Sequence, residues 1–257
     1  MLPGHGGILD RMDSHFSATP AITLLIIILL YMKNILLLGA TGSIGDSVLS
    51  VIEQNQQSLN LYAITLDSNT SKAKDISESF TPEYIHINNE KTFNKIKEDN
   101  EINSKVLNGS SDLSALINDD NVDIIVSAIT GFAGLEATAI ASKTGKTILL
   151  ANKESIVAAG ELILLSAESS GTTIIPIDSE HNAIFQCLAG EKNTDDVSKI
   201  IITASGGPFL NKSLSSLKGV TKEQALKHPN WSMGSKISID SATLVNKCLE
   251  LIEAKYL

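Results

Sequence analysis

The chain has 257 residues, a length that allows one large domain or two modest ones. Hydrophobic residues make up 43% of it and charged residues 19%, which supplies enough apolar material for a core and argues against a disordered chain. The net charge of -9 makes it a poor candidate for nucleic-acid binding, which needs clustered cations. Two cysteines without CxxC spacing argue against a disulfide framework or a structural zinc site and fit a reducing compartment.

The first 31 residues differ in character from the rest of the chain. Residues 1–20 are rich in glycine, histidine, serine and threonine, and residues 21–31 form an apolar run. This run is shorter than the about 20 residues of a membrane-spanning helix. The charges before it give no positive segment of the kind that opens a signal peptide. We therefore expect an atypical extension before a natural start at Met32 and no membrane association, with an interfacial anchor or an uncleaved signal as alternatives.

From residue 33 onward, short apolar strands alternate with helical segments. The strands are expected at residues 34–38, 61–66, 84–87, 122–127, 147–150 and 173–177, and three of the helices at 43–53, 91–98 and 134–143. Alternation of this kind predicts a parallel sheet with helices on both faces. The expected fold class is α/β, with a Rossmann-like nucleotide-binding domain over residues 32–177. An incomplete α/β catalytic domain is expected over residues 178–257.

The first expected strand runs into a glycine turn, GATGSIG, and then into a helix. Gly39 permits the tight turn, Gly42 lets a pyrophosphate approach the backbone, and Gly45 lets the helix pack closely on the strand. Free N–H groups at the start of the helix would face the phosphates. The GxxGxxG spacing is less specific than GxGxxG, and a turn without a ligand is the alternative. The strand before it and the helix after it favour dinucleotide binding.

The end of the second strand bears on the choice between NAD and NADP. Asp67 lies near the position from which an acid bonds the ribose 2′-hydroxyl of NAD. A 2′-phosphate would instead need donors, which could come from Ser68, Asn69, Lys72 and Lys74. These residues leave the choice between the two dinucleotides open.

Polar residues follow two later strands, where ligands bind in a parallel sheet. Lys153, in the NKES motif, could lie beside the cofactor or be an ordinary solvated lysine. Asp178 and Glu180 flank a hydroxyl and would point to one side of a strand-like stretch. Two close acids repel unless a cation or proton lies between them, and oxygen ligands suit Mg²⁺ or Mn²⁺. A surface acidic turn is the alternative for this pair taken alone.

A further helix is expected over residues 239–254. Its apolar residues recur at helical spacing and predict a buried stripe made of Val245, Cys248, Leu249 and Ile252. A neighbouring face would present Asn246, Lys247 and Glu250. The amide and the ammonium group could hold a phosphate or hydroxyl, and the carboxylate could complete a metal site. An ordinary Lys–Glu surface pair is the alternative.

Two loops before this helix carry further candidates. A strand is expected over residues 199–202, and the Ser-Gly-Gly turn after it would expose amides and the Ser205 hydroxyl as a phosphate nest does. The second loop carries Trp231 and Met233, which could form a core plug or a lid that closes over substrate. His228 could donate to a phosphate or be a structural histidine.

Taken in order, five motifs resemble the 1-deoxy-D-xylulose 5-phosphate reductoisomerase family: GATGSIG, NKES, IDSEHNAIFQCL, TASGGPF and HPNWSMGSKISIDSATLVNKCLELIEA. The resemblance covers most of residues 32–257. It implies an enzyme of the methylerythritol phosphate route to isoprenoids. Such an enzyme isomerises a ketose phosphate to a branched aldehyde and reduces it with NADPH to 2-C-methyl-D-erythritol 4-phosphate. The resemblance also implies Mg²⁺ or Mn²⁺, a sugar-phosphate substrate, a homodimer and a cytoplasmic location.

The resemblance implies roles for residues by their position in these motifs. The cofactor-binding residues would be Gly39, Thr41, Gly42, Ser43, Ile44, Gly45, Ser68, Asn69, Asn152, Lys153 and Glu154. The metal ligands would be Asp178, Glu180 and Glu250. The substrate-binding residues would be Ser179, Glu180, Ser205, His228, Trp231, Ser241, Asn246, Lys247 and Glu250. The catalytic set would be Asp178, Glu180, Glu250, Lys153 and His228, with Trp231 and Met233 in the lid.

Three departures from the family pattern affect these expectations. Many members carry Gly-Lys-Asn where this chain has Asp67-Ser68-Asn69, which bears on the contact to a 2′-phosphate. Family chains continue into a C-terminal helical domain, so we expect a partial chain that binds cofactor weakly and turns over poorly. The extension at 1–31 is the third departure.

Two other functions compete with this enzyme. One is another Rossmann-type oxidoreductase such as a semialdehyde dehydrogenase, which needs an exposed cysteine nucleophile in a polar setting. Cys187 lies in an apolar sequence and Cys248 on the predicted stripe, so neither looks suited. The other is a non-catalytic nucleotide-binding or membrane-tethered protein, in which the acids are only surface charge.

Overall fold

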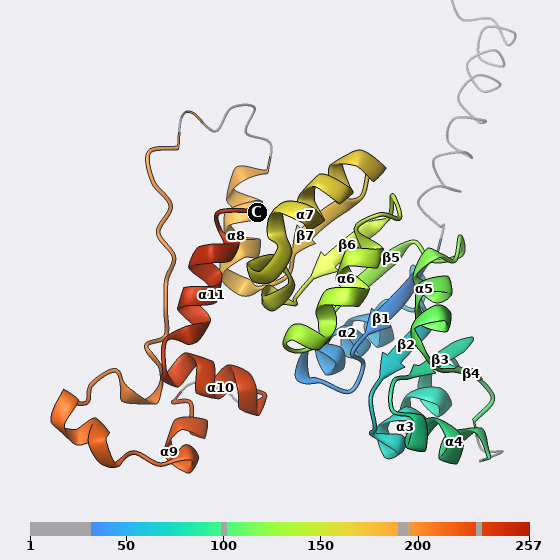
Figure 1. Cartoon of the computed structure of the whole chain (residues 1–257), viewed down its shortest axis with the longest axis horizontal. Coiled ribbons are helices and arrows are strands. Elements are labelled where there is room, and N and C mark those ends of the chain that lie inside the picture. The colour runs from blue at the N-terminus through green and yellow to red at the C-terminus, as the bar shows by residue number, and fades with distance from the viewer. Residues whose placement is uncertain (1–31, 99–101, 190–194, 196, 230–232) are drawn as a thin grey trace, which may run out of the picture.

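The computed structural model describes residues 32–257 except for 99–101, 190–194, 196 and 230–232. The predicted extension at 1–31 and Trp231 lie outside the described residues. In the described part, one parallel sheet has the strand order β4-β3-β2-β1-β5-β6-β7 (Figure 1). Its strands are β1 (Lys33–Leu38), β2 (Leu59–Leu66), β3 (Tyr84–Ile87), β4 (Lys105–Leu107), β5 (Ile124–Ser127), β6 (Thr147–Leu150) and β7 (Thr173–Pro176). The prediction of an α/β fold with a Rossmann-like parallel sheet is confirmed.

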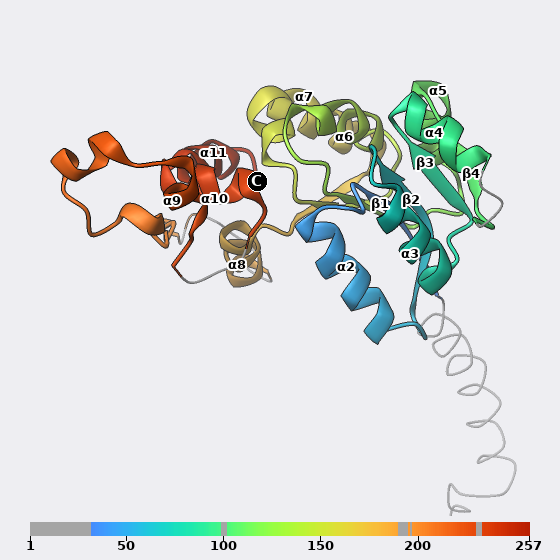
Figure 2. The same ribbon diagram turned by 90° about the horizontal axis from the view of Figure 1, so that it is seen from below.

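Helices cover both faces of this sheet. They are α2 (Ser43–Gln54), α3 (Thr70–Phe80), α4 (Glu90–Lys97), α5 (Ser110–Asn118), α6 (Leu135–Ala141) and α7 (Lys153–Ser170). On one face, α2, α3 and α4 bury Ile52, Ile76 and Ile96 in one apolar cluster with the strands. On the other, α5 and α7 bury Ile117 and Ile163 in a second cluster that also includes α6 residues. Figure 2 shows α2 and α3 on one side of the sheet and α6 and α7 on the other.

The chain leaves the sheet after β7 and forms α8 (Ser179–Leu188) and then a smaller helical lobe. The lobe contains α9 (Lys222–Leu226), α10 (Ser235–Ala242) and α11 (Val245–Glu253), with short 3₁₀ helices at Gly207–Phe209 and Leu214–Gly219. Both views place this lobe beyond the β7 end of the sheet, with α11 near α8 (Figures 1 and 2). No helix in the described ranges has the length and apolar character needed to cross a membrane.

The prediction of a strand at 199–202 is wrong. Residues 197–206 adopt no regular secondary structure and pair with no strand of the sheet, which ends at β7. Ile200 is 50% exposed and Ile201 71% exposed. The apolar run finds no buried edge there, so its β-forming composition has nothing to pair with.

The single helix predicted over 239–254 is interrupted. α10 ends at Ala242, and Leu244 adopts the left-handed conformation with φ of 61° before α11 begins. A left-handed residue cannot continue a right-handed helix, so α10 and α11 take different directions. This break lets the two helices approach the same cavity from different sides.

The predicted buried stripe on α11 is also wrong. Val245 is 44% exposed and Ile252 41% exposed, Cys248 is exposed, and Leu249 is only half-buried. The residues that α11 buries are instead acidic, as the next subsection describes. Cys248 is therefore not disqualified as a nucleophile by burial, although it does not line either of the cavities described below.

Candidate active site

The glycine turn joins β1 to α2 at the carboxyl end of the sheet. Gly39 has φ of +87°, and a Cβ there would lie 2.8 Å from the Ala128 carbonyl carbon. At Gly45 a Cβ would lie 2.5 Å from the Ala40 carbonyl oxygen. Gly42 differs, because a Cβ would have its nearest neighbour at 3.7 Å and the residue caps α2 without a side-chain hydrogen bond. The open space beside Gly42 and the N–H groups of the first turn of α2 can therefore accept an anion.

A cavity of about 350 Å³ opens beside this turn. The predicted residues Gly39, Thr41 and Gly42 line it. Residues from the ends of the neighbouring strands that also line it are Thr65, Asp67, His86 and Asn88, and of these only Asp67 was singled out by the sequence. Ser68 and Asn69 do not line the cavity, and the Asn69 side chain instead accepts a hydrogen bond from the Lys72 backbone at the start of α3.

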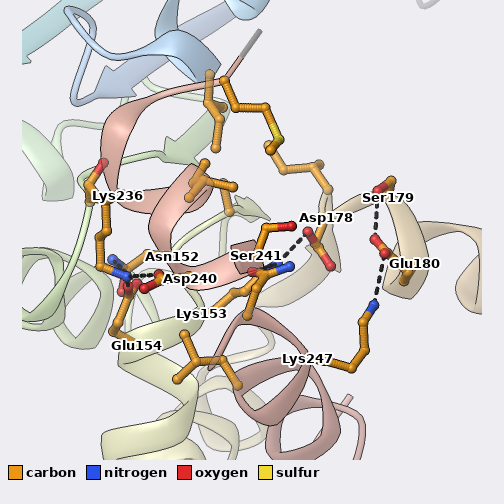
Figure 3. A pocket seen from close by; sticks show the side chains of 18 of the residues that line it. Asn152, Lys153, Glu154, Asp178, Ser179, Glu180, Lys236, Asp240, Ser241 and Lys247 are labelled. Carbon is orange, nitrogen blue, oxygen red and sulfur yellow. Dashed lines mark hydrogen bonds and ion pairs between the residues drawn. The ribbon is translucent and has the colours of Figure 1, made fainter. Parts of the chain in front are cut away.

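A second cavity, also about 350 Å³, lies between the end of the sheet, α8 and the α10–α11 pair (Figure 3). The predicted site residues that line it are Ile44, Asn152, Lys153, Glu154, Asp178, Ser179, Glu180, Ser205, Ser241, Asn246 and Lys247. Met233 lines it too, and Ser43 lies near the loop at Gly234. Ala128, Ile129 and Thr130 line both cavities, so the two adjoin at the end of β5.

Three carboxylates converge beside the second cavity, two of them lining it and the third, Glu250, buried behind them. Asp178 is the N-cap of α8, Glu180 lies in the first turn of that helix, and Glu250 comes from α11. One oxygen of each lies within 4.8 Å of the others, and Glu250 is fully buried. The strand-like arrangement expected for the first two is wrong, because α8 begins between them at Ser179, whose hydroxyl donates to Glu180 at 2.6 Å. A set of nearby oxygen ligands fits a hard divalent cation such as Mg²⁺ or Mn²⁺.

Two ammonium groups lie among these carboxylates, and Figure 3 shows both lysines in the cavity. Lys153, in the first turn of α7, places Nζ 2.7 Å from Asp178 Oδ1 and 3.2 Å from Glu250 Oε1. Lys247 places Nζ 3.0 Å from Glu180 Oε1 and also pairs with Glu250. Two ammonium groups thus face three carboxyl groups.

The ion pairs favour the charged forms of these side chains. Burial opposes the charge of Asp178, but the hydrogen bond from His181 and the Lys153 ammonium lower the pKa of Asp178 below its usual value. Burial likewise opposes the charges of the two lysines. The carboxylates of Asp178 and Glu250 outweigh it at Lys153, and those of Glu250 and Glu180 outweigh it at Lys247, so the pKa of each lysine is raised. Asn246 adds neutral contacts, donating from Nδ2 to Glu250 at 2.6 Å and accepting from Lys153 at 2.9 Å.

A buried histidine lies behind Asp178. His181 places Nδ1 3.0 Å from Asp178 Oδ2 and Nε2 3.0 Å from the Glu250 carbonyl oxygen. Both partners accept hydrogen bonds, so both ring nitrogens donate. Glu253 is fully buried on the same side, and burial raises the pKa of its carboxyl group to about 7. The sequence analysis assigned no role to either His181 or Glu253.

A third group of polar side chains lies at one corner of the second cavity, which Ser205 and Ser241 line and His228 adjoins through its contact with Ser205. Ser205 Oγ lies 2.9 Å from His228 Nε2 and 3.5 Å from Ser241 Oγ. The next two residues, Gly206 and Gly207, have φ of +79° and +65° and so turn the backbone tightly at this corner. Two hydroxyl groups and an imidazole from three separate segments can together donate to one phosphate.

The structure adds a lysine that the sequence analysis missed. Lys236, at the start of α10, pairs with Glu154 of α7 and lies 2.6 Å from Asp240 Oδ2 (Figure 3). Its i, i+4 spacing to Asp240 is visible in the sequence. Its pairing with Glu154 depends on the approach of two distant helices, which no local pattern gives.

Asn152 supports this site structurally, and we expect Asn152→Ala to destabilise the chain by about 2–3 kcal/mol. Its side chain is 2% exposed, caps α7 by accepting from the Ser155 backbone at 2.8 Å, and donates to the Gly131 carbonyl at 2.8 Å. Asn69→Ala is a matched control, since it removes an exposed cap of the same type and should cost about 1 kcal/mol. Urea unfolding measures both, and equal losses would contradict the buried role of Asn152.

Family models match most of the described chain. Residues 35–160 match the model described as 1-deoxy-D-xylulose 5-phosphate reductoisomerase, and residues 174–257 match the model of the C-terminal domain of that enzyme. Residues 1–29 match a different model, that of the Cytidylyltransferase family.

Curated relatives and solved structures agree with the two reductoisomerase models. A 1-deoxy-D-xylulose 5-phosphate reductoisomerase from Clostridium tetani is 49% identical over 229 residues, 88% of this chain and 59% of the relative. A structure of DOX-P reductoisomerase in complex with NADPH, fosmidomycin and magnesium has a TM-score of 0.83 and 42% identity, and covers 88% of this chain and 58% of its own. The Zymomonas mobilis reductoisomerase in complex with NADPH has a TM-score of 0.78 and 43% identity, with the same coverage.

The chain therefore spans less than two thirds of the length of these relatives. Over that span, the matched models, the identity and the shared fold agree with the motifs found in the sequence. The chain belongs to the 1-deoxy-D-xylulose 5-phosphate reductoisomerase family.

Proposed function

We propose that this chain carries the cofactor-binding and metal-binding parts of a 1-deoxy-D-xylulose 5-phosphate reductoisomerase acting in isoprenoid precursor biosynthesis. The reaction isomerises 1-deoxy-D-xylulose 5-phosphate to a branched aldehyde of the same composition. A hydride from NADPH and a proton then give 2-C-methyl-D-erythritol 4-phosphate. The observation that carries the proposal is the convergence of Asp178, Glu180 and Glu250 at the wall of a cavity that adjoins the glycine-turn cavity.

In this proposal the three carboxylates hold Mg²⁺ or Mn²⁺. Their oxygen atoms fit such an ion in type and in spacing. When bound, a divalent ion supplies a Lewis acid that stabilises the negative charge developing on the substrate oxygens. The ammonium groups of Lys153 and Lys247 pair with these carboxylates and can orient their oxygen atoms. The magnesium in the solved relative supports this choice of ion.

The far end of the substrate would lie in the corner formed by Ser205, His228 and Ser241. Their hydroxyl and imidazole groups lie close enough together to donate hydrogen bonds to one phosphate. Fixing the phosphate there lets its binding energy orient the reacting carbons. Met233 lines the cavity on the adjoining loop, in a position to help exclude water from the intermediate.

The dinucleotide would lie in the glycine-turn cavity. Its pyrophosphate would face the first turn of α2 at Gly42, and its nicotinamide would reach the second cavity at residues 128–130, which both cavities share. Asp67 lines the ribose end, whereas Ser68 and Asn69 do not. The preference for NADPH over NADH therefore rests on the family, and titration with both dinucleotides tests it.

The competing function of a semialdehyde dehydrogenase has less support from the geometry. Cys187 and Cys248 are both free and exposed, but neither lines either cavity. A nucleophile must reach the substrate carbonyl from inside the cavity that binds it.

The homodimer and the cytoplasmic location implied by the family stay predictions. Sedimentation of the purified chain tests the homodimer.

Calorimetry on the full chain separates the enzyme from a non-catalytic nucleotide-binding protein. We expect NADPH to bind, and a hydroxamate phosphonate to bind only when Mn²⁺ is present, because the hydroxamate oxygens complete the coordination of the ion. Glu250→Gln should remove the Mn²⁺-dependent binding, and Glu161→Gln, at an exposed position on α7, should not. Mn²⁺-independent binding, or unchanged binding in Glu250→Gln, would favour the non-catalytic protein.

A further inference from the structure

The His181 ring connects the two elements that carry the proposed metal ligands. The side chain is 3% exposed and belongs to α8. Nδ1 donates to Asp178 Oδ2 at the start of α8, and Nε2 donates to the Glu250 carbonyl oxygen in α11. One rigid ring thus sets the position of Asp178 relative to the helix that carries Glu250.

This contact divides the two oxygens of Asp178 between different partners. Oδ2 faces His181 at 3.0 Å, while Oδ1 faces Lys153 at 2.7 Å inside the cavity. Only Oδ1 is therefore directed at a cavity cation. If the ring moved, Asp178 could rotate and present either oxygen, so the coordination would lose a fixed geometry.

Glu253 approaches the same ring from α11. It lies one turn after Glu250, is fully buried, and places Oε2 3.5 Å from His181 Nδ1. Neither of its carboxylate oxygens has a hydrogen-bond partner among the described residues. A buried carboxyl group without hydrogen bonds destabilises a fold in either protonation state, so packing alone does not explain its presence. Its contact with His181 indicates a role in holding the ring.

We propose that Glu253 is a positioning residue for the metal-binding carboxylate of Asp178, acting through the His181 ring. The inference rests on the proposed metal site. Asp178 Oδ2 and Glu253 Oε2 lie 3.0 and 3.5 Å from the same Nδ1, so both carboxyl groups attract this N–H, the ring keeps one orientation and the Nε2 bond to α11 is retained. Partners of this kind orient metal ligands without touching the ion.

Mn²⁺ binding to the full chain, followed by electron paramagnetic resonance, tests this role. Glu253→Gln and His181→Gln are each expected to weaken Mn²⁺ binding by about 10–100-fold, the usual effect of removing a residue that orients a ligand. Both should broaden the spectrum of the bound ion in the same way, because both release Asp178. In the double variant the affinity should equal that of His181→Gln alone, since Glu253 then has no ring to act through.

The outcomes separate this role from the others. The positioning role would be overturned if Glu253→Gln left the Mn²⁺ affinity and the spectrum unchanged. It would also be overturned if the losses of Mn²⁺ affinity in Glu253→Gln and His181→Gln added up in the double variant. A second Mn²⁺ equivalent lost in Glu253→Gln would also overturn it, because Asp178, His181 and Glu253 would then form a cation site themselves. Absence of Mn²⁺ binding in the unaltered chain, or no loss in Glu250→Gln, would instead refute the proposed function. Thermal unfolding checks that each variant folds, and Glu253→Met serves where Glu253→Gln does not.

Discussion

Glu250→Gln is expected to weaken Mn²⁺ binding by more than about 100-fold, beyond the range for residues that only orient a ligand. It is also expected to destabilise the metal-free chain by about 3 kcal/mol, the scale for breaking a buried ion pair. Both effects arise because Glu250 is fully buried and pairs with both Lys153 and Lys247. Calorimetry measures the first effect and urea unfolding the second.

Glu180→Gln provides the matched comparison. The Glu180 side chain is 22% exposed, and the one ion pair it makes among the described residues is with Lys247, whose side chain is 24% exposed. Its loss should weaken Mn²⁺ binding as well, yet cost no more than about 1 kcal/mol of stability, as for partly solvated ion pairs. Equal stability losses in the two variants would show that the burial of Glu250 does not matter to the fold.

Gly45→Ala is expected to destabilise the chain by about 1–3 kcal/mol, the usual cost of overpacking. The added Cβ would lie 2.5 Å from the Ala40 carbonyl oxygen, which is backbone and cannot move without shifting the turn. Because α2 must then move away from β1, NADPH binding should fall along with stability. Thermal unfolding and fluorescence titration with NADPH measure the two effects.

Gly42→Ala should act on binding alone. Its φ of -87° suits any residue, and the nearest atom to a Cβ is 3.7 Å away, so the fold should tolerate the methyl group. That methyl group occupies the space through which a pyrophosphate would approach the amides of α2, and NADPH affinity should fall by about tenfold or more. Unchanged affinity in Gly42→Ala would place the pyrophosphate elsewhere.

The sheet could be predicted because its signals are local. Each predicted strand of the sheet is an apolar run that ends in polar or glycine residues, and their observed bounds differ by only a couple of residues from those expected. The strand wrongly predicted at 199–202 has the same apolar composition, but no strand lies beside it to pair with. Whether a partner strand is present depends on the tertiary structure and cannot be read from composition.

The lobe and the site geometry could be predicted only in part. The motifs identified Asp178, Glu180 and Glu250 as candidates, but most of the ion pairs that these acids make join segments far apart in the sequence. Lys153 and Glu250, for example, are separated by 97 positions. On α11 the apolar spacing predicted the wrong buried face, because ion pairs fixed which side turns inward. Glu253 carried no signal at all, since its significance comes from a histidine on another helix.

The two lysines have a consequence for how the cavity would respond to ions. Their ammonium groups already balance much of the carboxylate charge, so a divalent ion would enter by exchange with built-in monovalent ones. The affinity for Mn²⁺ is then the difference between two free energies, that of the carboxylates with the ion and that of the carboxylates with the two ammonium groups. Replacing either lysine by methionine would leave the carboxylate charge less balanced, so such a variant should hold a divalent ion more tightly than the unaltered chain.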